Sequence, residues 1–153
     1  MNKINKKLQN LSNPQFIIFS FLSAIIYLIY NVSLSFIIKE KAASIIFNST
    51  FLMIWGIFIA PFLETLIFQF AIIKIVKKLS KSYLLAIILS ICAFNIAHTF
   101  SLIGHIAFIP ISVFFAYIFY IYDEVNRNPF LRLSFIHFII NLTLIGPYLL
   151  FNL

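Results

Sequence analysis

Charged residues are scarce in this sequence. Only 10% of its 153 residues are charged, whereas about a quarter are charged in ordinary soluble domains. At the same time, 63% of the residues are hydrophobic and 18% are aromatic. Because so few polar side chains cannot cover a water-exposed surface, the composition excludes a soluble globular domain and predicts a membrane protein.

Glycine, proline and cysteine are also rare. Three glycines and five prolines exclude a flexible linker or a low-complexity tail. The single cysteine, Cys92, excludes an intrachain disulfide and a cysteine-based metal cluster, and its apolar surroundings favour a packing role. We therefore predict one transmembrane domain over residues 15–153, preceded by a polar, cytoplasmic N-terminal segment over residues 1–14.

The uncharged stretches have the lengths of membrane-spanning helices, since about 20 apolar residues cross the hydrocarbon core. One stretch covers residues 15–38, and another begins near residue 133, after a polar loop that we place from Asp123 to Arg132. Residues 82–122 form a run of 41 residues without a charge, long enough for two helices joined by a turn that we place near residues 101–104. Together with the run over residues 42–73, the sequence predicts an all-α, polytopic bundle of about five spans.

The run over residues 42–73 is longer than one untilted crossing of the membrane. Two explanations remain open. Either the polar residues Asn48, Ser49 and Thr50 lie near an interface, or the run is a broken helix with a kink at Pro61.

Lysine and arginine are distributed unevenly around these spans. With a cytoplasmic N-terminus, the inner segments hold nine of them and the outer segments hold two, and cytoplasmic loops carry such an excess in membrane proteins. The bias predicts a multi-pass protein of the cell membrane with a cytoplasmic N-terminus. It also explains the net charge of +7 without nucleic acid as a partner. The inner residues are Lys3, Lys6, Lys7, Lys74, Lys77, Lys78, Lys81, Arg127 and Arg132, and the outer residues are Lys39 and Lys41.

Glu64 is the only charged residue between Ala42 and Ala71. A charge at bilayer depth costs about 2.5–3.5 kcal/mol on insertion scales, and an ionisable residue within a span usually marks a functional site. A hydrogen-bonded packing role is the alternative. The remaining polar residues of the spans decide between these two interpretations.

All three histidines lie in apolar runs, and two of them have a partner four residues away. Phe94 precedes His98 and Asn141 follows His137 at that spacing, which places each pair on one face of a helix. His137 and Asn141 can therefore reach a single interior site. His105 has no such partner, and we interpret it as a packing residue.

These motifs, taken in order, resemble those of the CPBP family of intramembrane proteases. That family is named after CAAX proteases and bacteriocin processing, and it includes the type II CAAX prenyl endopeptidases and the bacterial Abi proteins. The resemblance covers about residues 51–145. The motifs are Pro61-x-x-Glu64-x-x-x-Phe68, Phe94-x-x-x-His98 and His137-x-x-x-Asn141.

The first motif departs from the family pattern, which has two adjacent glutamates and an arginine four residues after the second. Here Glu64 is kept, while Thr65 and Gln69 stand at the other two positions. Replacing both members of a buried ion pair is often close to neutral in energy, whereas removing one member strands a charge. We therefore predict an intact helix in which Thr65 and Gln69 form a neutral hydrogen bond.

The resemblance implies an intramembrane endopeptidase. Its substrate would be a membrane-associated or hydrophobic peptide or protein, lipidated or not, held in contact with membrane lipid. By resemblance, Glu64 and His98 activate a water molecule, and His137 and Asn141 stabilise the tetrahedral oxyanion. The composition, rich in isoleucine, phenylalanine, asparagine and lysine, is typical of a bacterial protein from an AT-rich genome.

A metal-dependent mechanism competes with this one. Glu64, His98 and His137 are ligand types that a catalytic zinc accepts, and the family has often been described as metalloproteases. However, the sequence holds no His-Glu-x-x-His motif, and a carboxylate bound to zinc is not also a free base. We therefore favour a mechanism without a cofactor and keep zinc as the alternative.

Two further functions remain open. A catalytically relaxed relative would bind a membrane peptide or protein, for example in bacteriocin immunity, and the neutral residues Thr65 and Gln69 favour it. A small transporter or proton relay would use Glu64 and the histidines as a pathway. The relay gives no reason for the paired spacings around His98 and His137.

The distances of the histidines from the basic residues disagree. At a rise of about 1.5 Å per residue, His98 lies some 25 Å along the chain from Lys81. By the same measure, His137 lies only about 8 Å from Arg132. If both basic residues mark the cytoplasmic boundary, the two histidines lie at different depths. Helix tilt, a break at Pro61, or basic residues lying beyond the membrane edge would each remove the conflict.

Overall fold

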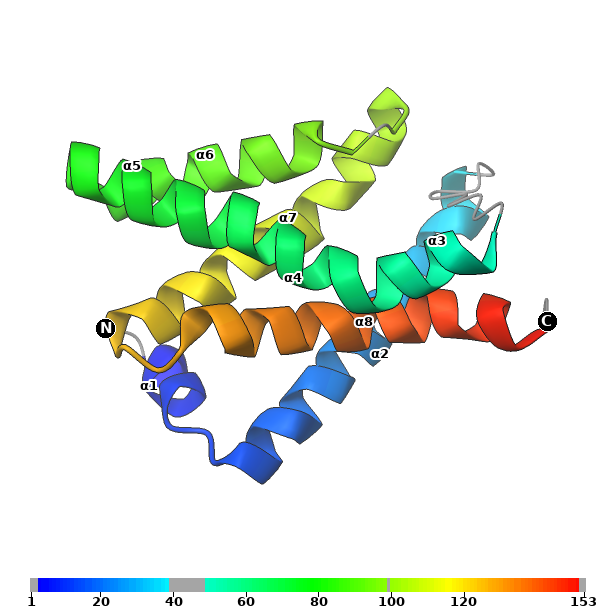
Figure 1. The fold of residues 1–153 in the computed structure, drawn as a ribbon, viewed down its shortest axis with the longest axis horizontal. Coiled ribbons are helices and arrows are strands. Elements are labelled where there is room, and N and C mark those ends of the chain that lie inside the picture. Colours follow the sequence, from blue (N-terminus) through cyan, green and yellow to red (C-terminus); the bar gives the residue numbers. More distant parts are fainter. Residues whose placement is uncertain (1–2, 39–48, 99, 152–153) are drawn as a thin grey trace.

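The computed structural model describes residues 3–38, 49–98 and 100–151, and over these residues it contains helices but no strand. The predicted all-α, polytopic bundle is confirmed (Figure 1). The elements in chain order are α1 (Lys3–Gln9), α2 (Asn13–Ile38), α3 (Thr50–Ile54), η1 (Trp55–Ile59), α4 (Ala60–Glu64), η2 (Thr65–Ala71), α5 (Ile72–Ser80), α6 (Tyr83–Ile96), α7 (Leu102–Glu124) and α8 (Pro129–Phe151).

Four stretches of helix in the described part of the chain are long and apolar enough to cross a membrane, which makes this a multi-pass membrane protein. They are Asn13–Leu34, Thr50–Ser80, Leu102–Glu124 and Pro129–Leu150. The fifth apolar helix, α6, has 14 residues, about 21 Å of helix, which is less than the roughly 30 Å of hydrocarbon. The expected number of about five spans therefore holds approximately, as four long helices and one short one in the described part of the chain.

The predicted turn between α6 and α7 is confirmed. α7 begins at Leu102, and the hydroxyl of Ser101 accepts a hydrogen bond from the backbone N–H of Gly104 at 3.1 Å. A β-carbon added to Gly104 would lie 2.8 Å from the Cβ of Phe100. Glycine is therefore required here because the chain passes too close for any side chain.

The segment from Thr50 to Ser80 is one continuous helix, so the described part of this run is not broken at Pro61. Ser49 caps its start, with the hydroxyl accepting from the N–H of Leu52 at 3.3 Å. Asn48, the other polar residue considered for an interface, lies outside the described residues. Two π-helical segments, η1 and η2, interrupt the α-helical hydrogen bonding on either side of α4.

We call the continuous helix from Thr50 to Ser80 the long helix. Its π-helical segments keep one of its faces directed toward α8. In a pure α-helix, positions four apart rotate by about 40° per step, and the wider π turns offset that rotation. Residues at every fourth position are therefore buried, and the first two of them pack with Ile145 of α8. We call this set the inner stripe; it consists of Met53, Ile57, Pro61, Thr65, Gln69 and Ile73.

α6 is buried along one stripe only, formed by Ala86, Ser90 and Phe94. Cys92 lies on the other side of the helix and is exposed. The predicted packing role of Cys92 is therefore wrong. The reason is that α6 is covered on a single face, which a uniformly apolar sequence does not reveal.

Arg132 lies inside α8. Its guanidinium carbon lies 4.5 Å from the ring centre of Phe16 and 4.8 Å from that of Tyr122, where the ring faces attract a cation. Arg132 had been assigned to a polar loop, which is wrong, because α8 begins at Pro129.

Several basic residues gather at one end of the bundle. Figure 1 shows α1, the end of α5 and the connection between α7 and α8 at this end, opposite the C-terminus. The Gln9 side chain donates to the carbonyl of Ile121 at 3.2 Å, and Arg127 donates to the carbonyl of Gln9 at 2.7 Å. α1 is thus held against α7 within the segment expected to be a polar N-terminus. We call this the basic end.

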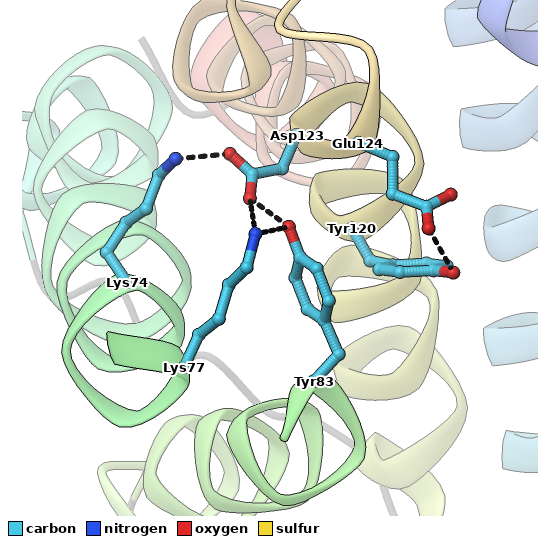
Figure 2. Close-up of polar contacts among 6 residues, drawn as sticks. All are labelled: Lys74, Lys77, Tyr83, Tyr120, Asp123 and Glu124. Carbon is cyan, nitrogen blue, oxygen red and sulfur yellow. Dashed lines mark hydrogen bonds and ion pairs between the residues drawn. The ribbon is translucent and has the colours of Figure 1, made fainter. Parts of the chain in front are cut away.

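Asp123 organises the basic end (Figure 2). Sequence analysis placed it in a polar loop, but it lies in the last turn of α7 with its side chain only 3% exposed. Its carboxylate is paired with Lys74, accepts from the hydroxyl of Tyr83, and lies 3.4 Å from the ammonium of Lys77. The carboxylate therefore ties α5, α6 and α7 together, because burial without these partners would be unfavourable.

Asp123→Ala is expected to lower the free energy of unfolding by about 1–3 kcal/mol, because the half-buried hydroxyl of Tyr83 and two ammonium groups lose their acceptor. The estimate stays low because both lysines are partly exposed. The measurement is thermal or denaturant unfolding in detergent. Glu124→Ala is the matched control, since Glu124 is exposed and bonds only Tyr120, at 2.7 Å. Equal stabilities for the two variants would contradict the role of Asp123.

Candidate functional site

The structure brings Glu64, His98 and His137 together from three parts of the fold. Glu64 is the last residue of α4, His98 follows α6, and His137 lies in α8. Oε2 of Glu64 lies 4.0 Å from Nε2 of His98 and 3.5 Å from Nε2 of His137. These separations are too long for strong direct hydrogen bonds and short enough for a water molecule to bridge the carboxylate and an imidazole.

The ring of His98 is oriented by the residue four positions before it. Nδ1 of His98 lies 2.8 Å from the backbone carbonyl of Phe94. A carbonyl oxygen only accepts, so Nδ1 carries the hydrogen, and in the neutral ring Nε2 presents a lone pair toward Glu64. The rings of Phe94, Phe100 and Phe108 enclose the imidazole, with centroids 4.9, 5.4 and 4.5 Å away. The Phe-x-x-x-His spacing thus gives His98 both a hydrogen-bond acceptor, the carbonyl of Phe94, and an aromatic ring to pack against.

His137 is almost fully buried, with 4% of its surface exposed. Its ring centre lies 4.4 Å from that of Phe115 and 6.0 Å from that of Phe94. Phe94 therefore packs against both imidazoles. Nδ1 of His137 has no hydrogen-bond partner in the protein.

Asn141 is the fourth predicted site residue. Its side-chain amide is hydrogen-bonded to the long helix and not to Glu64 or the histidines. Its Nδ2 donates to the carbonyl of Gly56 at 2.8 Å. The N–H of Ala60 bonds the carbonyl of Trp55 in the π turn, and Pro61 has no N–H to offer. The carbonyl of Gly56 is thereby left without a helical donor, and Asn141 supplies one. This bond fastens the helix of Glu64 to the helix of His137.

The predicted hydrogen bond between Thr65 and Gln69 is wrong. Both side chains are fully buried, yet Oγ1 of Thr65 and both side-chain polar atoms of Gln69 have no hydrogen-bond partner in the protein. The pair lies in the π-helical segment η2, whose wider turn changes the alignment that positions four apart have in an α-helix.

Sequence analysis missed the link between Asn95 and His105. The side-chain nitrogen of Asn95 donates to the backbone carbonyl of His105 at 3.0 Å, which orients the amide. Its oxygen then faces Nδ1 of His105 at 2.7 Å, so Nδ1 donates. The two bonds close the turn that carries His98. His105 is therefore a hydrogen-bonded packing residue, as expected, with a partner ten residues away that sequence analysis did not identify. The signal was present in the sequence, because Asn95 lies inside the Phe-x-x-x-His motif.

A metal centre was considered because Glu64, His98 and His137 have suitable donor atoms. Among the residues that the structure describes, no group of three or more histidine, cysteine, aspartate or glutamate side chains is arranged to hold a metal ion. No step below is derived through a metal.

Pro61 and Asn141 are expected to be coupled energetically. Asn141→Ala should cost about 1–2 kcal/mol of unfolding free energy, because the carbonyl of Gly56 loses its donor. In a Pro61→Ala background the cost should shrink, since the alanine N–H can bond that carbonyl. A double-mutant cycle measured by unfolding in detergent tests this. Thr143→Ala, which removes only a bond to the carbonyl of Ile139, is the control and should show no coupling; additive effects of Pro61 and Asn141 would contradict the account.

Comparison with known proteins identifies the family. The family model described as type II CAAX prenyl endopeptidase Rce1-like matches residues 46–143, which are 98 of the 153 residues. Neither the curated proteins nor the solved structures gave a significant match. The matched residues include Glu64, His98 and His137, and the resemblance to the CPBP family is confirmed. This chain belongs to the type II CAAX prenyl endopeptidase Rce1-like family.

Proposed function

We propose that this protein is an intramembrane endopeptidase that hydrolyses a peptide bond in a membrane-associated or hydrophobic peptide or protein. The observation that supports it best is the meeting of Glu64 with two imidazoles, at 4.0 and 3.5 Å. Family membership supports protease chemistry on a protein or peptide substrate in the membrane. The location in the cell membrane, with the basic end in the cytoplasm, is part of the proposal.

The proposed reaction uses a water molecule between Glu64 and His98. Glu64 takes a proton from that water as its oxygen attacks the carbonyl carbon of the substrate. The C–N bond then breaks, and the proton passes to the leaving amine. His98, fixed by its bond to the carbonyl of Phe94, shares the proton through Nε2. General acid–base catalysis of this kind contributes about 10²–10⁴-fold in rate.

The oxyanion is assigned to His137 and Asn141. A developing negative charge is stabilised best by donors that are already in place. His137 is held rigidly by its aromatic neighbours, and its Nε2 faces the site. The amide of Asn141 has two hydrogens; one is bonded to the carbonyl of Gly56, and the proposal assigns the second to the oxyanion.

The first motif, in which Thr65 and Gln69 stand in place of two charged family residues, is compatible with this chemistry. Thr65 and Gln69 belong to the inner stripe next to Glu64, and neither position leaves an ion without its partner, because both family charges are replaced. The same departure favours the second candidate, a catalytically relaxed protein that binds a membrane peptide or acts in bacteriocin immunity. Retention of the cellular function by a Glu64→Gln variant would select this second candidate.

Glu64→Gln and His98→Ala are each expected to lower kcat by about 10²–10⁴-fold, because each removes a group that handles the proton. The measurement is cleavage of a fluorogenic hydrophobic peptide by purified protein in proteoliposomes, with prenylated and unmodified peptides compared. Glu124→Gln is the control, since this exposed carboxylate lies at the basic end. Unchanged rates in the Glu64 and His98 variants would contradict the proposed mechanism.

Chelation should leave the cleavage rate unchanged. The prediction follows from a mechanism in which the Glu64 carboxylate is a free base. The measurement is activity after dialysis against 1,10-phenanthroline, followed by addition of zinc. A loss of activity that zinc restores would contradict the mechanism without a metal and favour the zinc alternative.

A further inference from the structure

Unsatisfied polar atoms are concentrated beside the candidate site. Over the described parts of the chain, seven buried side-chain nitrogen and oxygen atoms have no hydrogen-bond partner in the protein, and six of them belong to η2 and α8. One of the six belongs to Arg132, whose guanidinium packs on Phe16 of α2 and Tyr122 of α7, on the opposite face of α8 from Ser134. We call the four residues that carry the other five atoms the polar seam. They are Thr65, Gln69, Ser134 and His137.

The two halves of the polar seam face each other. The long helix and α8 run antiparallel, as three contacts along them show. The carbonyl of Gly56 is bonded to Asn141, Glu64 lies 3.5 Å from His137, and the ring centres of Phe70 and Phe130 are 6.0 Å apart. The residues between the second and third contacts must therefore lie opposite one another.

Thr65 and Gln69 occupy this interval on the long helix. Ser134 occupies it on α8, on the face that also carries Phe130 and His137. Both residues of η2 are on the inner stripe, and all three side chains are fully buried. The seam thus leads from His137 toward the basic end.

Burying so many polar atoms without any hydrogen-bond partner would cost free energy. Buried polar groups in native proteins nearly always have partners, either in the protein or in ordered water. Internal water typically bonds two to four such groups. The seam offers hydroxyl, amide and imidazole atoms, which together are a suitable lining for several water molecules.

We propose that the polar seam binds a file of ordered water molecules that extends from Gln69 to the Glu64–His137 contact. Each seam atom without a protein partner bonds one of these waters. The file supplies the water consumed by hydrolysis to a carboxylate otherwise surrounded by apolar helices. This supply role rests on the proposed function, whereas the binding of water to the seam does not.

Hydroxyl-radical footprinting with X-rays tests the water file without any need for activity. Radicals formed from bound water oxidise buried side chains next to it. Leu133 and Ile57 are both fully buried, but Leu133 adjoins the seam, whereas Ile57 lies on the inner stripe beyond Glu64. We expect labelling of Leu133 and not of Ile57 in the intact protein in detergent. Equal, background labelling of the two residues would overturn the proposal.

Two conservative variants identify the seam as the binding site. Thr65→Val and Ser134→Ala keep the shape of the helices and remove a hydroxyl each, so labelling of Leu133 should fall several-fold in the double variant. Ser90→Ala is the matched control, because Ser90 carries the remaining unpartnered hydroxyl, on α6. Labelling that persists in the double variant, or a rise in its melting temperature as expected for removal of dry polar groups, would overturn the proposal.

The supply role has its own measurement. If the file feeds the reaction, the double variant should lose roughly tenfold in kcat with KM unchanged, while Ser90→Ala keeps the rate of the intact protein. A normal kcat together with lost labelling would overturn the supply role. An intact protein that is labelled at Leu133 but cleaves no peptide would contradict the proposed function and leave the water file supported.

Discussion

A carboxylate placed among membrane helices needs polar partners, and this requirement governs the structure. Glu64 finds them in the imidazoles of His98 and His137, because the hydrocarbon around the bundle has no polar groups to offer. The three residues come from helices that pack together mainly through apolar side chains. Apolar packing specifies position loosely in a membrane, since lipid is as apolar as the side chains. Each of the three elements therefore carries an additional polar fastening.

The fastenings are local and differ in kind. Pro61 leaves the carbonyl of Gly56 without a helical donor, and Asn141 binds it, which fixes the helix of Glu64 against α8. Asn95 and His105 close the turn that carries His98. At the basic end, Asp123 joins the three helices α5, α6 and α7. The site is thus held rigid by hydrogen bonds outside it, which is the arrangement that a preorganised site requires.

The helices, the turn and the candidate site residues could be predicted from sequence patterns, whereas most tertiary contacts could not. The apolar runs predicted the helices, the Ser and Gly near residue 101 predicted the turn, and the spacing around His98 and His137 singled out two residues that meet Glu64. The placement of Asp123 and Arg132 failed, because a charge next to an apolar run looks the same whether it is paired inside the bundle or solvated. π-helical geometry also leaves no simple mark in the sequence, so the inner stripe was not foreseen.

The central claim is that Glu64 acts directly on His98 and His137 within one small polar space. The most direct measurement is nuclear magnetic resonance of the imidazole nitrogens in protein labelled at histidine, before and after Glu64→Gln. The account predicts that the resonances of His98 and His137 shift while those of His105, bonded to Asn95, stay in place. Unchanged resonances of His98 and His137, or equal shifts of all three histidines, would contradict it.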